Sequence, residues 1–167
     1  MDYYSILNLN REPFSNSPDP DFFFQSGQQQ GSLQKIEISI RLKRGLCVVA
    51  GEVGTGKSTL CRELIRRFSS TEEVSTHLIL DPLYPGSIKF LAAISECLTG
   101  IRGEPSDDEW TYKERIKKYL FAEGVEKKRT VVLIIDEGQK ITEPCLEYLR
   151  EFLNYETNVS FRQACLT

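Results

Sequence analysis

The eight residues GEVGTGKS, from Gly51 to Ser58, combine glycines, a lysine and a hydroxyl at spacings suited to binding phosphate. They fit the pattern G-x-x-x-x-G-K-[ST] at every fixed position. The glycines let the backbone curl so that successive N–H groups point at phosphate oxygens, and a helix starting there adds its positive dipole end. Lys57 supplies a mobile charge for the β and γ phosphates. We therefore predict a nucleotide-binding loop whose contacts come from Gly51, Glu52, Val53, Gly54, Thr55, Gly56, Lys57, Ser58 and Thr59.

A second stretch, VVLIIDEGQK, joins five apolar residues to two adjacent acids, Asp136 and Glu137. A nucleotide site needs a carboxylate for the magnesium ion at the end of a neighbouring strand, and Asp136 follows the apolar run at that place. We predict that Asp136 and Ser58 serve the metal. Glu137 is free to accept a proton from a water aimed at the γ-phosphate, so Glu137 and Lys57 are the predicted catalytic residues. Gln139 and Lys140 are expected at the surface or in contact with a neighbouring subunit.

Alternating strand and helix patterns position these two stretches. Apolar runs predict strands at 46–50, 75–81 and 131–135, and the last is apolar throughout, as in strands buried on both faces of a parallel sheet. Helical spacing of apolar residues predicts helices at 29–43, from Lys57 onward, around 88–98, at 110–126 and from 142 onward. Strands separated by helices of crossover length indicate an α/β domain with a mainly parallel sheet.

Composition excludes several classes of protein. With 167 residues and an apolar fraction of 40%, the chain is expected to form one ordinary globular domain. No apolar run approaches the ~20 residues of a membrane helix, and the N-terminus lacks the features of a secretory signal, so a cytoplasmic location is expected. The five cysteines are widely spaced without a C-x-x-C pair, which argues against disulfides and structural zinc; each is interpreted as a small buried hydrophobe.

Charge and histidine content point to no further site. The net charge of -3 predicts neither a nucleic-acid footprint nor a polybasic membrane patch. Basic side chains gather within 62–67, 113–118 and 127–129, and we interpret them as solvated helix faces. His77 is the only histidine and has no second ligand type near it in sequence, so no metal role is expected for it.

Three features carry a resemblance to a known family: PFSNSPDPDF at 13–22, GEVGTGKST followed by LCR, and VVLIIDEGQK followed by L-x-x-L-R and N-x-E-T. Over essentially its whole length the chain resembles the AAA+-type ATPases of the general secretion pathway protein A family. The resemblance implies an AAA+ (ASCE-type) P-loop NTPase fold, a three-layer sandwich, with ATP and Mg²⁺ as cofactors. It also implies ATP hydrolysis coupled to envelope or secretion-complex assembly, self-association of the full-length protein, and attachment to the inner membrane on its cytoplasmic side. Family members usually carry a histidine near Gln29, at the base-binding edge, and an alanine at Gly138.

We predict one P-loop ATPase domain over 1–167, divided into an N-terminal strap at 1–27 and a nucleotide-binding core at 28–167. In the resembled fold, the strand after the acidic pair inserts between that strand and the phosphate-loop strand, and 161–167 lies where the inserted strand begins. The polar tip of that strand, a last strand, a helical lid and an arginine finger are expected beyond residue 167. We therefore expect this piece to be incomplete at its C-terminal end and to hydrolyse ATP slowly.

Two other functions are considered. Relatives of the family serve exopolysaccharide export and, more distantly, DNA transposition, so a nucleotide-gated module acting on an assembly partner or on DNA is the alternative; salt-sensitive DNA binding would favour it. A P-loop kinase of small molecules is disfavoured, because an Asp-Glu pair after the strand suits the activation of water.

Overall fold

The computed structural model describes residues 3–7, 27–155 and 161–166, the last of these as backbone. The segment at 13–22 and most of the strap predicted at 1–27 lie outside these residues, so the division at residue 27 stays a prediction. Within the described ranges, none of the helices combines the length and the apolar character that crossing a membrane requires.

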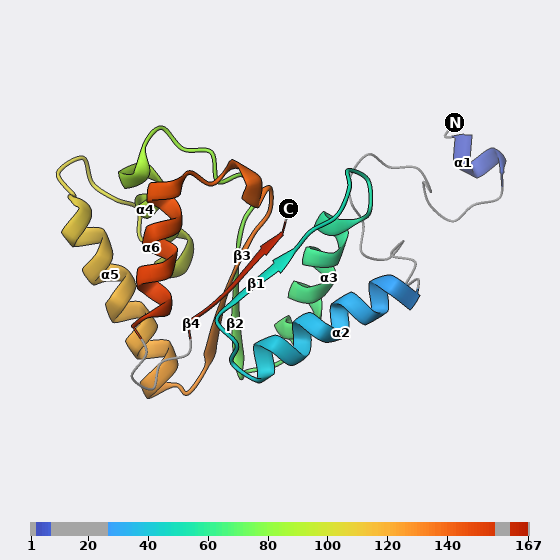
Figure 1. Cartoon of the computed structure of the whole chain (residues 1–167), viewed down its shortest axis with the longest axis horizontal. Helices are drawn as coiled ribbons and strands as arrows, with labels where there is room; N and C mark the ends of the chain where they lie inside the picture. The colour runs from blue at the N-terminus through green and yellow to red at the C-terminus, as the bar shows by residue number, and fades with distance from the viewer. Residues whose placement is uncertain (1–2, 8–26, 156–160, 167) are drawn as a thin grey trace.

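Four strands form one sheet in the order β1-β4-β3-β2, and every pairing is parallel (Figure 1). The strands are β1 (Leu46–Val49), β2 (Val74–Ile79), β3 (Thr130–Ile135) and β4 (Phe161–Leu166). β4 lies between β1 and β3, with Val48, Cys165 and Ile135 in one row across the three strands. The parallel sheet is confirmed, and so is the insertion of the strand that follows the acidic pair.

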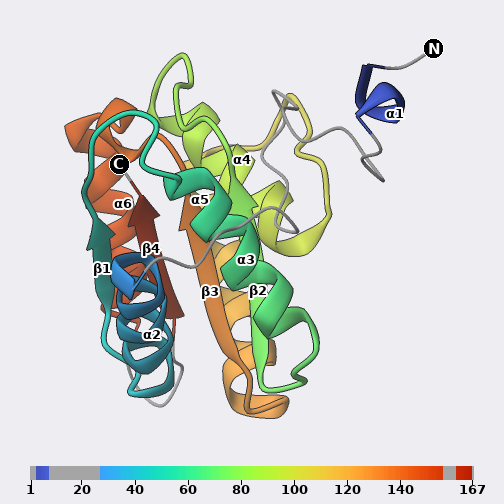
Figure 2. The same cartoon turned by 90° about the vertical axis from the view of Figure 1, so that its right-hand side faces the viewer.

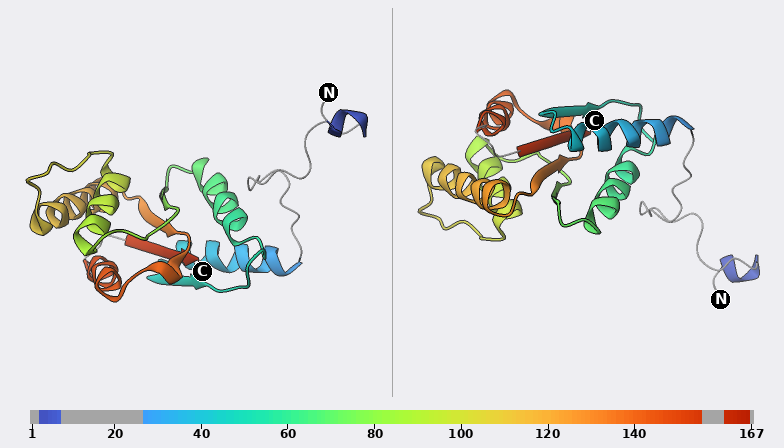
Figure 3. Two further views of the ribbon diagram at one scale, coloured as in Figure 1. Left: turned by 90° about the horizontal axis from the view of Figure 1, so that it is seen from above. Right: turned by 90° about the horizontal axis from the view of Figure 1, so that it is seen from below.

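Helices cover both faces of this sheet, which makes three layers (Figure 2, Figure 3). On one side lie α2 (Gly27–Arg41) and α3 (Lys57–Ser69), and on the other α4 (Ser87–Thr99), α5 (Glu109–Phe121) and α6 (Glu143–Leu153). The short elements are α1 (Tyr3–Ile6), the π-helix η2 (Ala122–Glu126) and the 3₁₀ turn η3 (Gly138–Lys140). Because side chains alternate along a strand, Val132 and Ile134 of β3 pack with α2 and α3, whereas Val131, Leu133 and Ile135 pack with α4, α5 and α6.

The helix predicted at 110–126 changes character along its length. It is an α-helix only to Phe121 and continues as the wider η2. The π-helical turn contains the buried Glu123, whose carboxylate accepts hydrogen bonds from Lys127 Nζ at 2.6 Å and Arg129 Nη1 at 3.3 Å. Sequence periodicity could not detect this change, because the apolar spacing of the two helix types is similar over a single turn.

Two of the basic side chains interpreted as solvated instead join helices, so the interpretation was wrong for them. Arg67 bonds Glu63, which is 1% exposed on α3, at 3.0 Å and Glu37 on α2 at 2.8 Å. Lys113 on α5 lies 2.8 Å from Glu151 on α6. Both cations are less than half exposed, so their ion pairs are less screened than those at an open surface.

The cysteines divide into two groups. Cys61 and Cys145 are buried, as expected, whereas Cys47 and Cys97 are only half-buried. Cys47 is less buried than expected because β1 is an edge strand of the described sheet. The side chain of Cys165 lies outside the described part of the chain.

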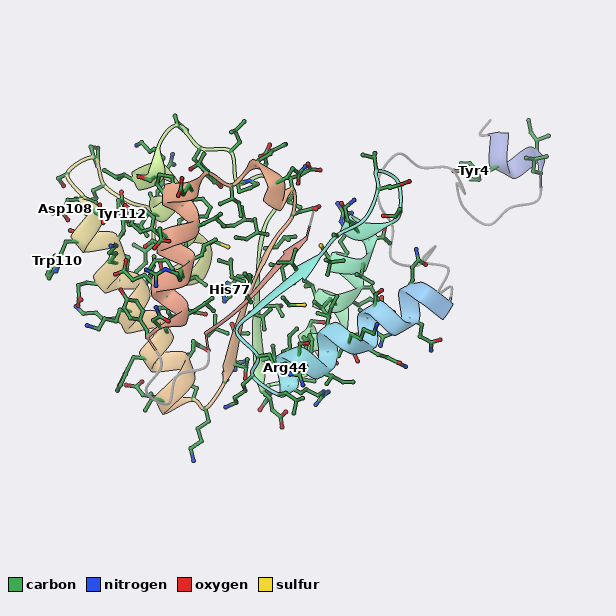
Figure 4. All side chains as sticks on the ribbon, in the orientation of Figure 1. Tyr4, Arg44, His77, Asp108, Trp110 and Tyr112 are labelled. Atoms are coloured by element: carbon green, nitrogen blue, oxygen red, sulfur yellow. The ribbon has the colours of Figure 1, made fainter. Side chains whose placement is uncertain are left out.

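His77 sits on β2 within a hydrogen-bond network (labelled in Figure 4). Its Nδ1 lies 3.0 Å from the Cys97 carbonyl oxygen, and its Nε2 lies 3.0 Å from both Ser75 Oγ and Tyr119 Oη. Since a carbonyl only accepts, Nδ1 carries the proton, and the single lone pair of Nε2 accepts from one of the two hydroxyls, whose oxygens lie 3.3 Å apart. This arrangement uses both nitrogens in the neutral ring, and burial lowers the pKa of His77 below its ordinary value.

This lowered pKa predicts a loss of stability in weak acid. As pH falls below about 6.5, the unfolded chain takes up a proton at His77 before the folded chain does, so the free energy of unfolding falls. The expected loss is at most about 1.4 kcal/mol per pH unit in this window. Urea denaturation at pH 7.5 and 5.5 measures it, and a His77→Gln variant should lose less over the same interval. Equal losses in both proteins would contradict the assignment.

The core also predicts unequal effects for two isoleucines on α2. Ile36 is 2% exposed and Ile38 is 52% exposed. Ile36→Ala leaves a cavity against α3 and β3 and should lower the free energy of unfolding by about 2–5 kcal/mol. The matched control Ile38→Ala should change it by no more than about 0.5 kcal/mol. Chemical denaturation of both variants checks the difference, and similar losses would refute this packing.

Candidate functional site

The predicted phosphate loop connects β1 to α3 and has the backbone that its glycines permit. Gly54 and Gly56 have φ angles of 82° and 84°, in the left-handed region that residues other than glycine rarely adopt. Gly56 is also the N-cap of α3, and its carbonyl accepts the first helical bond from Leu60 N at 2.9 Å. The first N–H groups of α3 therefore face the loop, where a helix N-terminus favours an anion.

Side-chain bonds within the loop hold its shape. Lys57 Nζ donates to the carbonyl oxygens of Gly51 and Glu52, each at 2.9 Å. Thr55 Oγ1 donates to the same Glu52 oxygen at 2.8 Å. Val53 is fully exposed at the turn. The lysine ammonium thus lies over the loop itself.

A cavity of about 200 Å³ lies between the phosphate loop and α2. Its described lining consists of Gln29, Ser32, Val49, Ala50, Gly51, Thr55, Gly56, Lys57 and Leu60. Gln29 Nε2 donates to the Thr55 carbonyl oxygen at 3.3 Å, which joins the start of α2 to the loop. Lys57 is the only charged residue in this lining. The family resemblance associates the position of Gln29 with the edge of the site that binds the nucleotide base. Ser32, which also lines the cavity, was not predicted from the sequence. The signal for it was its i,i+3 spacing from Gln29, which puts both residues on one face of a helix.

Asp136 follows β3 at the same edge of the sheet as the loop. Val48 of β1 and Ile135 of β3 share a row across β4. The segments that follow β1 and β3 therefore leave the sheet at nearly the same level, with their backbones about 10 Å apart. Asp136 is 8% exposed, and its Oδ1 accepts a hydrogen bond from Glu137 N at 3.0 Å. Burial, and next the negative charge of Asp136, raise the pKa of Cys61 on α3 to about 12. The Asp136 carboxylate therefore follows β3 at the edge of the sheet from which the phosphate loop starts.

Glu137 begins the short turn after Asp136. Its backbone is left-handed, with φ 56° and ψ 37°, and its side chain is 46% exposed. Gln139 Nε2 donates to Glu137 Oε2 at 2.7 Å, and Lys140 Nζ lies 4.0 Å from the same oxygen. Lys140 also bonds Asp81, just beyond β2, at 3.2 Å. Gln139 is exposed, as expected, and Lys140 is half-buried; both contact the predicted base.

The remaining predicted residues fall around this arrangement. Ser58 and Thr59 are half-buried in the first turn of α3, and Glu52 is exposed in the loop. The described residues contain no group of three His, Cys, Asp or Glu side chains placed to hold a metal. The structure thus brings the loop, Ser58 and Asp136 to one edge of the sheet. Glu137 lies at the same edge, because it follows Asp136 in the chain.

Comparison with known proteins identifies relatives of this chain. Residues 40–163 match the sequence profile of the AAA domain family. The chain is 31% identical over 159 residues to General secretion pathway protein A of Aeromonas hydrophila; this alignment covers 93% of the chain and 28% of the relative. The chain therefore spans less than a third of that relative's length.

Solved structures share the fold. Cdc6p from Pyrobaculum aerophilum superposes with a TM-score of 0.66 at 13% identity, covering 92% of this chain and 41% of that one. The ORC2 protein of Aeropyrum pernix superposes with a TM-score of 0.59 at 17% identity, covering 92% and 43%. At such identities the likeness shows the fold alone. The sheet order and the phosphate loop of this chain indicate the same fold. The chain belongs to the AAA domain family and has the P-loop ATPase fold of that family.

Proposed function

We propose that this chain binds ATP with Mg²⁺ and hydrolyses it to ADP and phosphate. The observation that carries the proposal is the place of the buried Asp136 carboxylate, directly after β3 at the edge of the sheet where the phosphate loop joins β1 to α3. A buried carboxylate beside a phosphate loop suits a bound cation, because burying an uncompensated charge is costly.

The phosphates would be held by the loop from Gly51 to Thr59, with Lys57 moving from the carbonyls of Gly51 and Glu52 to the β and γ phosphates. Backbone N–H groups at the start of α3 would supply the remaining contacts. The base would enter the cavity beside α2, where Val49, Ala50 and Leu60 give apolar contact and Gln29 and Ser32 give polar contact. This mixture is typical of small-molecule sites.

The Ser58 hydroxyl and the Asp136 carboxylate would serve Mg²⁺. Both are hard oxygen donors, which Mg²⁺ prefers, and this ion commonly takes one or two protein ligands together with substrate phosphates and water. Such a site needs no third acidic side chain, so the donor set fits the ion. When bound, the ion would neutralise charge on the β and γ phosphates.

Glu137 would act as the general base for the attacking water. Its side chain is half exposed, so water can reach it, and a carboxylate placed beside a water molecule can accept its proton. We expect slow turnover by the isolated chain, because Lys57 is the only cation among the described residues that line the cavity. An added arginine raises the rate of P-loop enzymes by about 10³–10⁵.

The biological role is proposed from the relative. We infer that the ATP cycle serves assembly in a general secretion pathway, the process named for the Aeromonas protein. Self-association, an assembly partner and a cytoplasmic position at the inner membrane are parts of the same proposal. So is the assignment of 1–27 as a strap and 28–167 as the nucleotide-binding core of one domain. Nothing in the described site favours DNA or exopolysaccharide export over this role.

Two substitutions separate binding from hydrolysis. Lys57→Ala should weaken ATP binding about 10- to 100-fold, because hydrogen bonds to charged groups contribute about 1.5–3 kcal/mol. Glu137→Gln should bind ATP normally but lower the rate of phosphate release about 10²–10⁴-fold, because the base is lost. Binding is measured with a fluorescent ATP analogue, and hydrolysis with radiolabelled ATP at enzyme excess, which detects slow turnover.

Matched controls are Lys89→Ala on α4 and Glu147→Gln on α6, whose side chains are exposed. Neither should change binding or hydrolysis. Wild-type affinity in Lys57→Ala would overturn the phosphate assignment, and wild-type turnover in Glu137→Gln would overturn the general base.

A further inference from the structure

Gln139 makes the shortest contact to the predicted base. Its amide Nε2 lies 2.7 Å from Glu137 Oε2, although the Gln139 side chain is exposed. An exposed hydrogen bond contributes little to stability, since water competes for both groups. Such a bond can nevertheless decide which direction a carboxylate faces.

The backbone on both sides of Glu137 is already constrained. Asp136 Oδ1 accepts from Glu137 N at 3.0 Å, and Lys140 N donates to the Glu137 carbonyl oxygen at 2.9 Å. The φ angle of 56° is an uncommon one for glutamate, so the turn is specified by these bonds rather than by residue preference. The torsions of the Glu137 side chain are the freedom that remains, and they are several for this residue type.

The contacts to the carboxylate fall on one oxygen. Gln139 Nε2 and Lys140 Nζ both approach Oε2, at 2.7 Å and 4.0 Å. Lys140 also bonds Asp81 Oδ2 at 3.2 Å, which ties the turn to the end of β2. Within the described part of the chain, Oε1 has no hydrogen-bond donor and is available to a water molecule. A base oriented by a third group is a recurring arrangement in hydrolytic sites.

We propose that Gln139 is a positioning residue for ATP hydrolysis, holding Oε2 of Glu137 so that Oε1 faces the attacking water. This inference rests on the proposed function, because it requires Glu137 to act as the base. Gln139 touches neither nucleotide nor water in this scheme. Its effect passes through the orientation of Glu137, and Lys140 supports it from the side of Asp81.

Replacing the amide tests the inference. Gln139→Met keeps the length of the side chain but removes the donor, and should lower kcat for ATP hydrolysis about tenfold, because a misplaced catalytic group reacts slowly. The KM for ATP should stay within about twofold, since no nucleotide contact is lost. Gln34→Met, the same change at an exposed position on α2, should leave both constants unaltered.

Gln139→Glu adds a readout that a structural role would not give. At low pH a protonated Glu at this position can still donate to Oε2, whereas at high pH the two carboxylates repel each other. The ratio of its kcat to the wild-type kcat should therefore rise about fivefold between pH 8.5 and pH 5.5. The corresponding ratio for Gln139→Met should be flat.

The results for these variants distinguish a failure of this inference from a failure of the proposed function. If Glu137→Gln abolishes hydrolysis while Gln139→Met retains or exceeds wild-type kcat, Gln139 does not position the base and the proposed function stands. A flat ratio for Gln139→Glu would overturn the inference in the same way. If neither Lys57→Ala nor Glu137→Gln affects binding or hydrolysis, the proposed function fails and the inference fails with it.

Discussion

The burial of β3 on both faces is the constraint on which the rest of the molecule depends. All six of its residues are buried, and its five apolar residues alternate between the two separate halves of the core. A strand in this position needs a hydrogen-bonded neighbour on each side and helices above and below. β2 and β4 meet the first requirement, and the helices on the two faces meet the second. The burial of β3 thus accounts for its place inside the sheet, between β4 and β2.

The same constraint locates the chemistry. An apolar strand buried on both faces cannot carry charge until it leaves the sheet, so Asp136 and Glu137 can only follow its last residue. Because every strand is parallel, the chain after β1 emerges at the same edge and curls into the phosphate loop. The carboxyl ends of parallel strands are the usual place for ligands in open α/β sheets. The loop and the acids are therefore neighbours although about 80 residues separate them in the chain.

Local signals were sufficient for the elements and for the loop. Gly100 ends α4 with a φ of 71°, and Gly54 and Gly56 take the left-handed angles that their pattern implies. These features depend on residues close in sequence, so periodicity and glycine positions predict them. The helix that becomes η2, and the half-buried Cys47 and Cys97, were not predictable in the same way. These features depend on which side chains and strands pack against each residue in the folded chain.

By itself, the sequence determined the α/β class, the phosphate loop and the candidate roles of Lys57, Ser58, Asp136 and Glu137, because each follows from residue type and short spacing. Only the tertiary structure decided that Arg67 joins α2 to α3 and that Gln139 and Lys140 converge on one oxygen of Glu137. Those contacts are set by the packing of strands and helices and by the left-handed turn after β3. A hydrogen bond requires a direction as well as a distance, and sequence spacing specifies neither for side chains beyond a regular element.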